Sequence, residues 1–141
     1  MRRDRRLRNL SLDHYHALVL ARFIDAMCIR DCLDEFAVPI VRERFEAEIV
    51  PHFHLVETLL AALEGRGADA LVARTRSEHA TMLRLLEQAR TTDPSSLREL
   101  AKLMAAHVRF EERELYPACE ELLDDGVLEA VACARTSEPR A

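Results

Sequence analysis

The chain has 141 residues, nearly half of them apolar, with three glycines, no tryptophan and a formal net charge of −5 at pH 7. This length suits one domain that buries its own core, and the composition is typical of an all-helical fold. The acidic balance argues against nucleic acid as a partner. No apolar run reaches the roughly 18 residues that a membrane span requires, so we expect no membrane partner.

A basic arm opens the chain. Residues 1–8 hold five arginines and one aspartate. The apolar stretch behind them is too short for the core of a signal peptide. We therefore expect a solvated arm, residues 1–10, on a cytoplasmic protein.

Four long helices and a short fifth are predicted after the arm. The predicted helices cover residues 11–34, 39–64, 68–90, 96–117 and 118–134. Ser11 suits the N-cap of the first, the Gly65-Arg-Gly67 turn ends the second, and Ser96 with Glu99 matches a capping box for the fourth. Short connections favour antiparallel neighbours. The sequence thus predicts an all-α fold, an up-down-up-down antiparallel four-helix bundle over residues 11–134, with a disordered tail at 135–141.

All six histidines fall within the four long predicted helices. His107 and Glu111 are one turn apart, so both can reach one metal ion from the same side. Imidazole and carboxylate ligands together suit iron, zinc or manganese better than calcium or magnesium. Counted from the shared turns, His52, His79 and His107 come to one level, whereas His14 is offset by about 9 Å at 1.5 Å per residue. The spacing predicts one metal site inside the bundle.

Several residues near the candidate ligands have other expected positions or roles. His16 and His54 each lie two positions from a candidate ligand, and we expect them at the surface or behind a ligand. A plain salt-bridged helix face is the alternative for the pair at 107 and 111. The aromatic side chains of the motif are expected in the core, and Glu112 is expected either to face outward or to orient a ligand. Cys28 and Cys32, one turn apart, are expected as reduced thiols.

These segments resemble the hemerythrin-like, or HHE cation-binding, family over about residues 10–123. The strings that carry the resemblance are Leu12-Asp-His14, Pro51-His52-Phe53, Glu78-His79 and His107-x-x-x-Glu111-Glu112-x-x-Leu115-Tyr116-Pro117. The resemblance implies two non-haem iron ions in the bundle core, histidine ligands from all four helices and two bridging carboxylates. The ligands it implies here are His14, His52, His79, His107 and Glu111.

The second bridging carboxylate is where the chain departs from the family. The family spacing places it at position 56, which is Val56 here. Glu57 is the neighbouring carboxylate but lies 100° further around a regular helix, so it needs a local widening, which Pro51 favours. We expect Glu57 to pair with His52. The alternatives are Glu57 with His54, Glu48, or occupancy by a single iron or zinc ion.

The resemblance implies binding, sensing or detoxification of dioxygen, nitric oxide or peroxide, or iron handling. Binding or sensing is favoured over peroxide-degrading enzyme activity. The alternative function is a metal- or redox-responsive regulatory interaction module that uses the basic arm and the fifth helix as contact surfaces. A bundle whose metal site has decayed is a third reading, and homodimer formation is left open.

Overall fold

The computed structural model of the chain describes residues 3–31, 33–34, 36–90 and 93–137, with side chains as far as residue 134. The elements are α1 (Arg8–Ile29), α2 (Ala37–Arg44), η1 (Phe45–Ile49), α3 (Val50–Leu63), α4 (Asp69–Gln88), α5 (Ser96–Phe110), η2 (Glu111–Leu115), α6 (Tyr116–Leu122) and α7 (Asp125–Ser137), where η marks a π-helical turn. The described residues contain no strand, only an isolated bridge between Arg90 and Asp93. The predicted all-helical class is confirmed.

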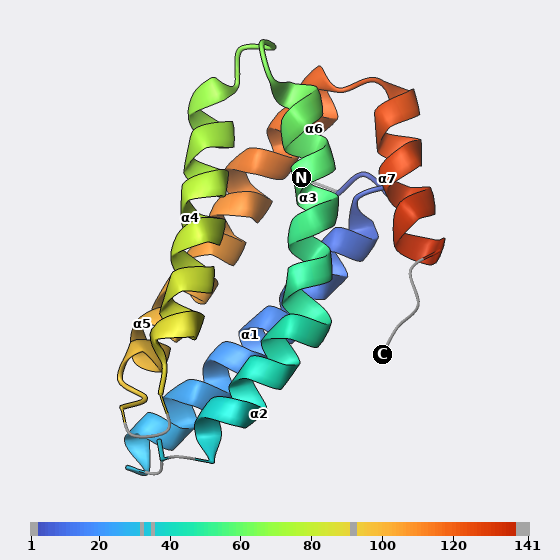
Figure 1. The fold of residues 1–141 in the computed structure, drawn as a ribbon. Helices are drawn as coiled ribbons and strands as arrows, with labels where there is room; N and C mark the ends of the chain where they lie inside the picture. The colour runs from blue at the N-terminus through green and yellow to red at the C-terminus, as the bar shows by residue number, and fades with distance from the viewer. Residues whose placement is uncertain (1–2, 32, 35, 91–92, 138–141) are drawn as a thin grey trace.

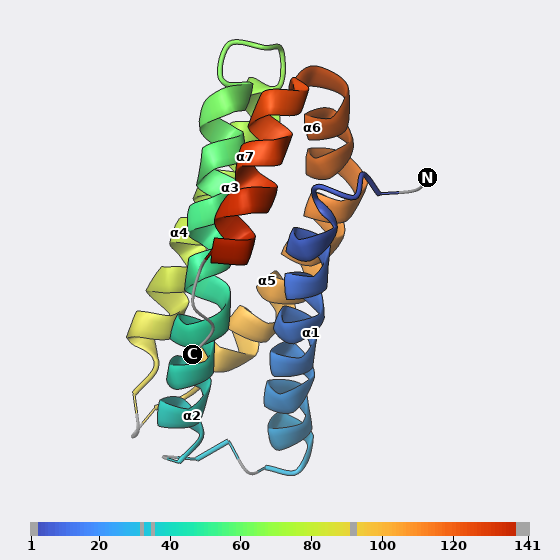
Figure 2. The same ribbon diagram turned by 90° about the vertical axis from the view of Figure 1, so that its right-hand side faces the viewer.

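The helices form an elongated molecule in which the long helical segments run along its length (Figures 1 and 2). In Figure 2, α1 runs down one side, and α2, η1 and α3 return along the other. In Figure 1, α4 descends beside α3, and α5 climbs behind it to α6 at the opposite end. The short helix α7 then packs alongside α3. None of the described helices is long and apolar enough to cross a membrane.

Both N-cap predictions are wrong. Helix α1 begins at Arg8, three residues before Ser11, because Leu7 and Leu10 are buried and tertiary packing extends the helix toward the N-terminus. Helix α5 begins without a side-chain cap, and the Ser96 hydroxyl instead donates to the carbonyl of Leu85 in the preceding helix. Tertiary contacts thus override the local capping signals.

Other element ends also differ from the prediction. The first helix ends at Ile29 rather than near 34, and the helix predicted over 118–134 is split at residues 123–124, between α6 and α7. Asp124 makes the split, since its carboxylate accepts a hydrogen bond of 3.0 Å from the N–H of Val127 in the first turn of α7. The predicted tail at 135–141 overlaps α7, which reaches Ser137, and its last four residues lie outside the described residues.

Two wide turns interrupt the long helices, and each ends just before a proline. Pro51 and Pro117 have no N–H to donate to the carbonyl four residues back. The residue before each proline donates instead to the carbonyl five residues back, Val50 to Phe45 and Tyr116 to Glu111. One π-helical turn follows in each case, and such turns are frequent at functional sites.

The basic arm is held against the body of the molecule. Arg3 pairs with Glu112 and Glu120, and Arg6 pairs with Asp4 and Asp125. The side chains of these two arginines are only 19% and 17% exposed. The arm therefore packs on η2, α6 and α7 and is not freely solvated.

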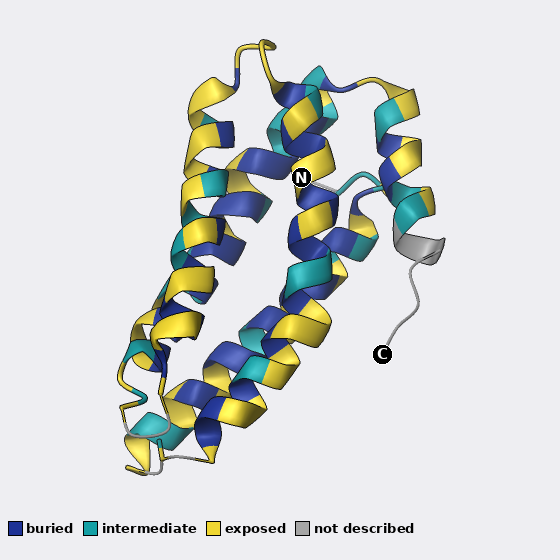
Figure 3. Ribbon diagram, in the orientation of Figure 1, coloured by how far each residue is buried: buried dark blue, intermediate teal, exposed yellow. Residues whose placement is uncertain are grey.

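The apolar core is divided into two clusters. One fills the space between the C-terminal part of α1, α2, η1 and the adjoining ends of α4 and α5, and contains Ile24, Phe45 and Met104. The other joins the arm to α3, α6 and α7, and contains Leu7, Leu59 and Leu128. Dark blue inward faces along the rods mark these buried residues in Figure 3. Along each long helix, the buried polar side chains lie near the junction of the two clusters.

Candidate metal centre

Four histidines from four helices converge on one glutamate. His14 lies on α1, His52 on α3, His79 on α4 and His107 on α5, and the carboxylate of Glu111 begins η2. All five side chains are buried, and Glu111 has no exposed surface. The ligand atoms form two groups, each with all atoms within 4.8 Å of one another. The groups are His14, His52 and Glu111, and His79, His107 and Glu111.

The Nε2 atoms of all four imidazoles face this carboxylate. The distances to Oε1 of Glu111 are 2.8 Å from His14, 3.4 Å from His52 and 3.3 Å from His107. His79 Nε2 lies 4.0 Å from the other oxygen, Oε2. Three of the imidazoles therefore lie nearest Oε1 of Glu111, and His79 lies nearest Oε2.

The offset predicted for His14 is absent. Its ring centroid lies 5.0 Å from that of His52. The first helix ends five residues earlier than predicted and the second begins two residues earlier, so His14 lies 15 residues before the end of α1 and His52 lies 15 after the start of α2. The two histidines consequently reach the same level as their neighbours.

Three of these rings each donate a hydrogen bond from Nδ1 to a carboxylate other than Glu111. Nδ1 of His14 donates to Glu112 (2.9 Å), Nδ1 of His52 to Asp13 (3.0 Å) and Nδ1 of His107 to Glu78 (2.7 Å). A carboxylate in this position fixes the ring and the tautomer and raises the basicity of the opposite nitrogen, an arrangement common behind metal-binding histidines. The Nε2 atom of each ring is thereby the one aimed at Glu111.

Two of those carboxylates are themselves paired with arginines. Arg3 lies 3.1 Å from Glu112, and Arg74 lies 3.0 Å from Glu78. The arm and α4 thus each supply a guanidinium group that holds a carboxylate in place. Glu112 accordingly orients a histidine, which is one of its two predicted roles.

Charge at the centre is distributed unevenly. Burial would raise the pKa of Glu111, but the His107 imidazole 3.3 Å away and the hydrogen bonds from His14 and His52 outweigh it and hold the pKa well below its usual value. Burial likewise opposes protonation of His14, yet its bonds to Glu111 and Glu112 raise its pKa to about 9. For His79, burial prevails and lowers the pKa to about 3. At neutral pH the cluster therefore contains an ionised Glu111, a protonated His14 and a neutral His79.

The donor set fits a metal ion of the kind that the spacing predicted. Nε2 of His79, Nε2 of His107 and Oε2 of Glu111 are buried and lack a hydrogen-bond partner. Buried polar atoms without a partner are rare in folded proteins and are costly unless another group satisfies them. Four imidazoles and a shared carboxylate are ligands suited to iron, zinc or manganese. The residues present therefore fit a metal site.

The structure does not bring Glu57 to this cluster. Its side chain is 49% exposed and lies 2.6 Å from Arg76, while Val56 is fully buried in the apolar core. The wide turn η1 lies before His52, so the five-residue step from His52 to Glu57 is regular helix and turns the carboxylate roughly 140° away from the histidine. The other carboxylate alternative, Glu48, is exposed.

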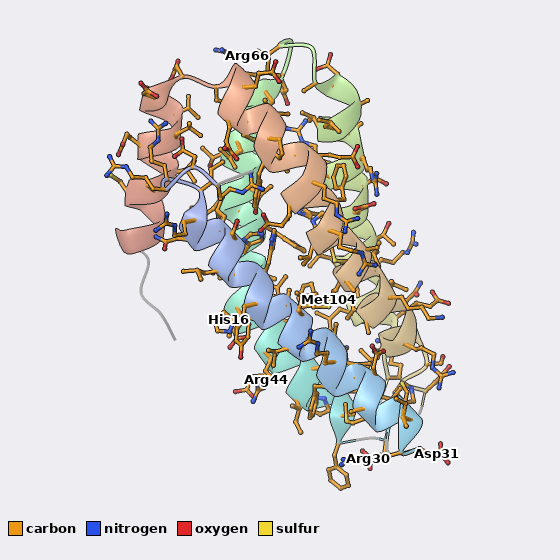
Figure 4. The ribbon with its side chains drawn as sticks, turned by 180° about the vertical axis from the view of Figure 1, so that it is seen from behind. His16, Arg30, Asp31, Arg44, Arg66 and Met104 are labelled. Atoms are coloured by element: carbon orange, nitrogen blue, oxygen red, sulfur yellow. The ribbon has the colours of Figure 1, made fainter. Side chains whose placement is uncertain are left out.

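The remaining histidines also lie outside the cluster. His16 and His54 are exposed, and Figure 4 shows His16 on the flank of α1. Cys28 is a free, partly buried thiol, in line with the prediction for it, and Cys32 lies outside the described residues.

Sequence reasoning missed Asp13 and Glu78 as partners of the ligand histidines. In the sequence, both residues are noted only within the strings that carry the family resemblance. Each adjoins a candidate ligand in the sequence, and on a helix neighbouring side chains differ by 100° in direction. That signal places them near the site but does not show which histidine of another helix they face.

A small cavity adjoins the cluster. Its volume is about 10 Å³, room for about one water molecule. Apolar side chains form most of its wall, namely Ala17, Ile49, Phe53, Met82, Met104 and Val108. Figure 4 shows Met104 between α1 and α5. On the other side of the cluster, the hydroxyl of Tyr116 lies 3.3 Å from Nε2 of His14. The site therefore combines buried ligands with space for a very small molecule.

Comparison with known proteins gives one match. The model of the hemerythrin HHE cation-binding domain matches residues 9–119, which include all five converging residues and their three carboxylate partners. None of the curated proteins and none of the solved structures with which the chain was compared matches it. The matched residues make up most of the chain, and it therefore belongs to the hemerythrin HHE cation-binding domain family.

Proposed function

We propose that this protein holds two non-haem iron ions that share Glu111 as a bridge. The observation that carries the proposal is the division of the five buried ligands into two groups with Glu111 common to both. His14 and His52 are the histidine ligands on one side, and His79 and His107 on the other. The chain directions in Figures 1 and 2 support the antiparallel up-down-up-down four-helix bundle in which such centres form.

The surrounding residues prepare the histidines for this role. Asp13, Glu78 and Glu112 keep three Nδ1 protons in place, so the Nε2 atoms are the ones that can bind metal. The Nε2 proton of His14 must leave before that nitrogen becomes a ligand, and metal binding is expected to release protons. Iron held by these residues would supply a position for a ligand and a change of oxidation state.

We further propose that the ligand of the centre is a diatomic molecule or peroxide. The adjoining cavity has a volume of about 10 Å³ and a mostly apolar wall, which admits a molecule such as dioxygen, nitric oxide or hydrogen peroxide and excludes a larger substrate. The function supported best is binding, sensing or detoxification of such a molecule.

The number of ions depends on position 56. Val56 is fully buried where the family carries a second carboxylate, and among the described residues Glu111 is the carboxylate that both groups share. Each group still offers two histidines and one carboxylate oxygen, a set of three protein ligands that also occurs at open catalytic metal sites. We expect two ions per chain, with the second bound more weakly than in a centre with two carboxylate bridges.

The test is anaerobic loading with ferrous iron, followed by elemental analysis and an optical spectrum before and after air. Two irons per chain with a new charge-transfer band would support the di-iron centre. One iron would contradict the bridge, and Val56→Glu would then be expected to raise the content to two. Absence of bound iron in a folded protein would overturn the proposal.

The regulatory-module alternative gains no support from the arm. Arg3 and Arg6 pair with carboxylates of the same molecule, so their charges are not available to an acidic partner. The fifth helix, α7, packs on α3 through buried Leu128 and Val131.

A further inference from the structure

A hollow lined by arginines lies on the outer side of α5 and η2. Its volume is about 210 Å³, and its lining contains Arg74, Arg109 and Arg113 with a single carboxylate, Glu114. Ala106 and Phe110 complete the lining. Three guanidinium groups lie against Glu114 in the lining and Glu78 beside Arg74, which leaves an excess of one positive charge on a chain whose net charge is −5.

Two of the arginines have no partner among the described residues. Arg109 and Arg113 are exposed, lie one helical turn apart and so project from the same side of α5 and η2. Like charges so placed repel each other unless an anion lies between them. An oxyanion is the natural counter-charge, because a guanidinium group matches the geometry of its oxygens.

The third arginine is held in a fixed position. The guanidinium carbon of Arg74 lies 3.9 Å from the centre of the Phe110 ring, and its Nε donates to Glu78 at 3.0 Å. Its Nη1 lies 3.5 Å from Glu114, whose side chain is 53% exposed. A surface ion pair of this kind contributes little, about 0–1 kcal/mol, so another anion can replace Glu114.

We propose that the hollow binds a small tetrahedral oxyanion of the phosphate or sulfate class, and that this binding is linked to the metal centre. The link is the chain of bonds from Arg74 through Glu78 to His107, with 3.0 Å between the first pair and 2.7 Å between the second. An anion bound to Arg74 would therefore be connected to His107, a proposed metal ligand, through two hydrogen bonds, with Glu78 between them.

The direction of the effect follows from charge. An anion on Arg74 withdraws positive potential from Glu78, which then accepts the Nδ1 proton of His107 more strongly. A stronger acceptor at Nδ1 makes the opposite nitrogen, Nε2, a better ligand. The anion should thus tighten metal binding, and by thermodynamic reciprocity metal should tighten anion binding.

The site itself is tested on the metal-free protein. Sulfate is titrated calorimetrically at constant ionic strength set with sodium chloride. Sulfate is chosen over phosphate because it binds ferrous iron less avidly, so the same anion can be used in the iron-affinity experiment below. We expect one saturable sulfate per chain, lost in the double variant Arg109→Gln/Arg113→Gln. The matched control, Arg98→Gln/Lys102→Gln, removes two exposed charges one turn apart on the same helix and should bind as the unmodified chain does. Absence of saturable binding, or equal loss in the control, would overturn the site.

The linkage is tested by ferrous iron affinity in sulfate and in chloride at equal ionic strength. We expect sulfate to tighten iron binding about five-fold or more, and the double variant at 109 and 113 to show equal affinity in both salts. Sulfate binding without a change in iron affinity would overturn the linkage. Because the calorimetric titration needs no metal, failure of the di-iron proposal would leave the anion site measurable.

Discussion

Asp13 illustrates how one side chain determines what another can do. Its carboxylate is buried, lies 3.0 Å from Nδ1 of His52 and also lines the small cavity. A neutral imidazole has one N–H, and a carboxylate on Nδ1 commits that proton to one side of the ring. His52 is thereby ready to offer Nε2 to a metal ion.

We expect Asp13→Asn to weaken iron binding about 10- to 100-fold, because the amide keeps the shape but removes the charge that fixes the His52 ring. Titration of ferrous iron under anaerobic conditions measures the loss. Glu57→Gln is the matched control, since it removes a carboxylate that pairs with Arg76 at the surface, and its iron affinity should equal that of the unmodified chain. Equal affinities for both variants would exclude a role for Asp13 in positioning His52.

The site could be predicted from the sequence to the extent that it follows helical spacing. His107 with Glu111 is a one-turn pair, and the levels of His52 and His79 follow from residue counts along antiparallel helices. Glu57 was the predicted ligand that the structure leaves outside, because the wide turn precedes His52 and cannot turn Glu57 inward. The pairing of Asp13 with His52 joins two helices, and no count along one helix reveals which side chains meet across the core.

At the scale of the element, the wide turn η2 brings two functional side chains onto one face. Glu111 and Tyr116 are five residues apart and would point roughly 140° apart on a regular helix. A turn closed by a bond from the N–H of Tyr116 to the carbonyl of Glu111 brings them together, and both lie within 3.3 Å of Nε2 of His14. Pro117 is the cause of this geometry.

Pro117→Ala is therefore expected to lower iron affinity by about ten-fold while the chain stays helical. Alanine restores the N–H and permits a regular turn, which moves the Tyr116 hydroxyl away from His14. Iron titration together with circular dichroism measures both effects. Pro39→Ala, in the first turn of α2 where no N–H is needed, should change neither. Unaltered affinity in the Pro117 variant would show that the wide turn is not needed at the site.

The arm gives a prediction that depends on pH. The hydrogen bond from Arg6 lowers the pKa of Asp4 from 3.8 to about 2. A carboxyl whose folded pKa is depressed stabilises the fold above its unfolded pKa, and this stabilisation is lost as the pH falls toward the folded value. We expect Asp4→Asn to be less stable than the unmodified chain at pH 6, with a difference that shrinks between pH 4 and pH 3.

Urea denaturation at pH 6, 4 and 3 measures that difference. Asp25→Asn provides the control, because Asp25 is exposed and has no ion pair among the described residues, so the same change of net charge should leave stability nearly unaltered. A difference for Asp4→Asn that does not vary with pH would contradict the proposed ion pair.

The existence of each long helix was predictable, and so were the ends on either side of the glycine turn and the start at Ser96, but the two ends of the first helix were not. Apolar residues at three- and four-residue spacing predicted each long helix, and the glycines at 65 and 67, with φ of 73° and 88°, mark the turn where the second ends. The caps at Ser11 and Ser96 failed because buried Leu7 and the bond from Ser96 to Leu85 reflect packing with other parts of the chain. Local signals do not report such contacts.

At the scale of the whole molecule, a polar layer separates two apolar clusters. Each cluster packs as an ordinary core, but the layer between them holds several buried groups without partners. Burying such groups is costly unless a ligand satisfies them. Metal binding should therefore add directly to the stability of the fold.

We expect ferrous iron at 100 times its dissociation constant to stabilise the fold by about 2.7 kcal/mol, which is roughly 5–10 °C in melting temperature for a chain of this size. Anaerobic thermal denaturation with and without iron measures the shift. His107→Ala should reduce the shift, because it removes a ligand from one of the two groups. Retention of the full shift in this variant would contradict the assignment of His107 as a ligand.

The size of the cavity beside the site has a kinetic consequence. Space for about one water molecule allows one ligand at a time, and each entry or exit requires bordering side chains to rotate within a closely packed interior. Such rotations follow local fluctuations of the protein and are slower than diffusion in water. The residence time of a bound molecule should thus depend on how tightly Met82 and Met104 pack, and homologous chains with other residues there could share one equilibrium affinity and differ widely in their rates of exchange.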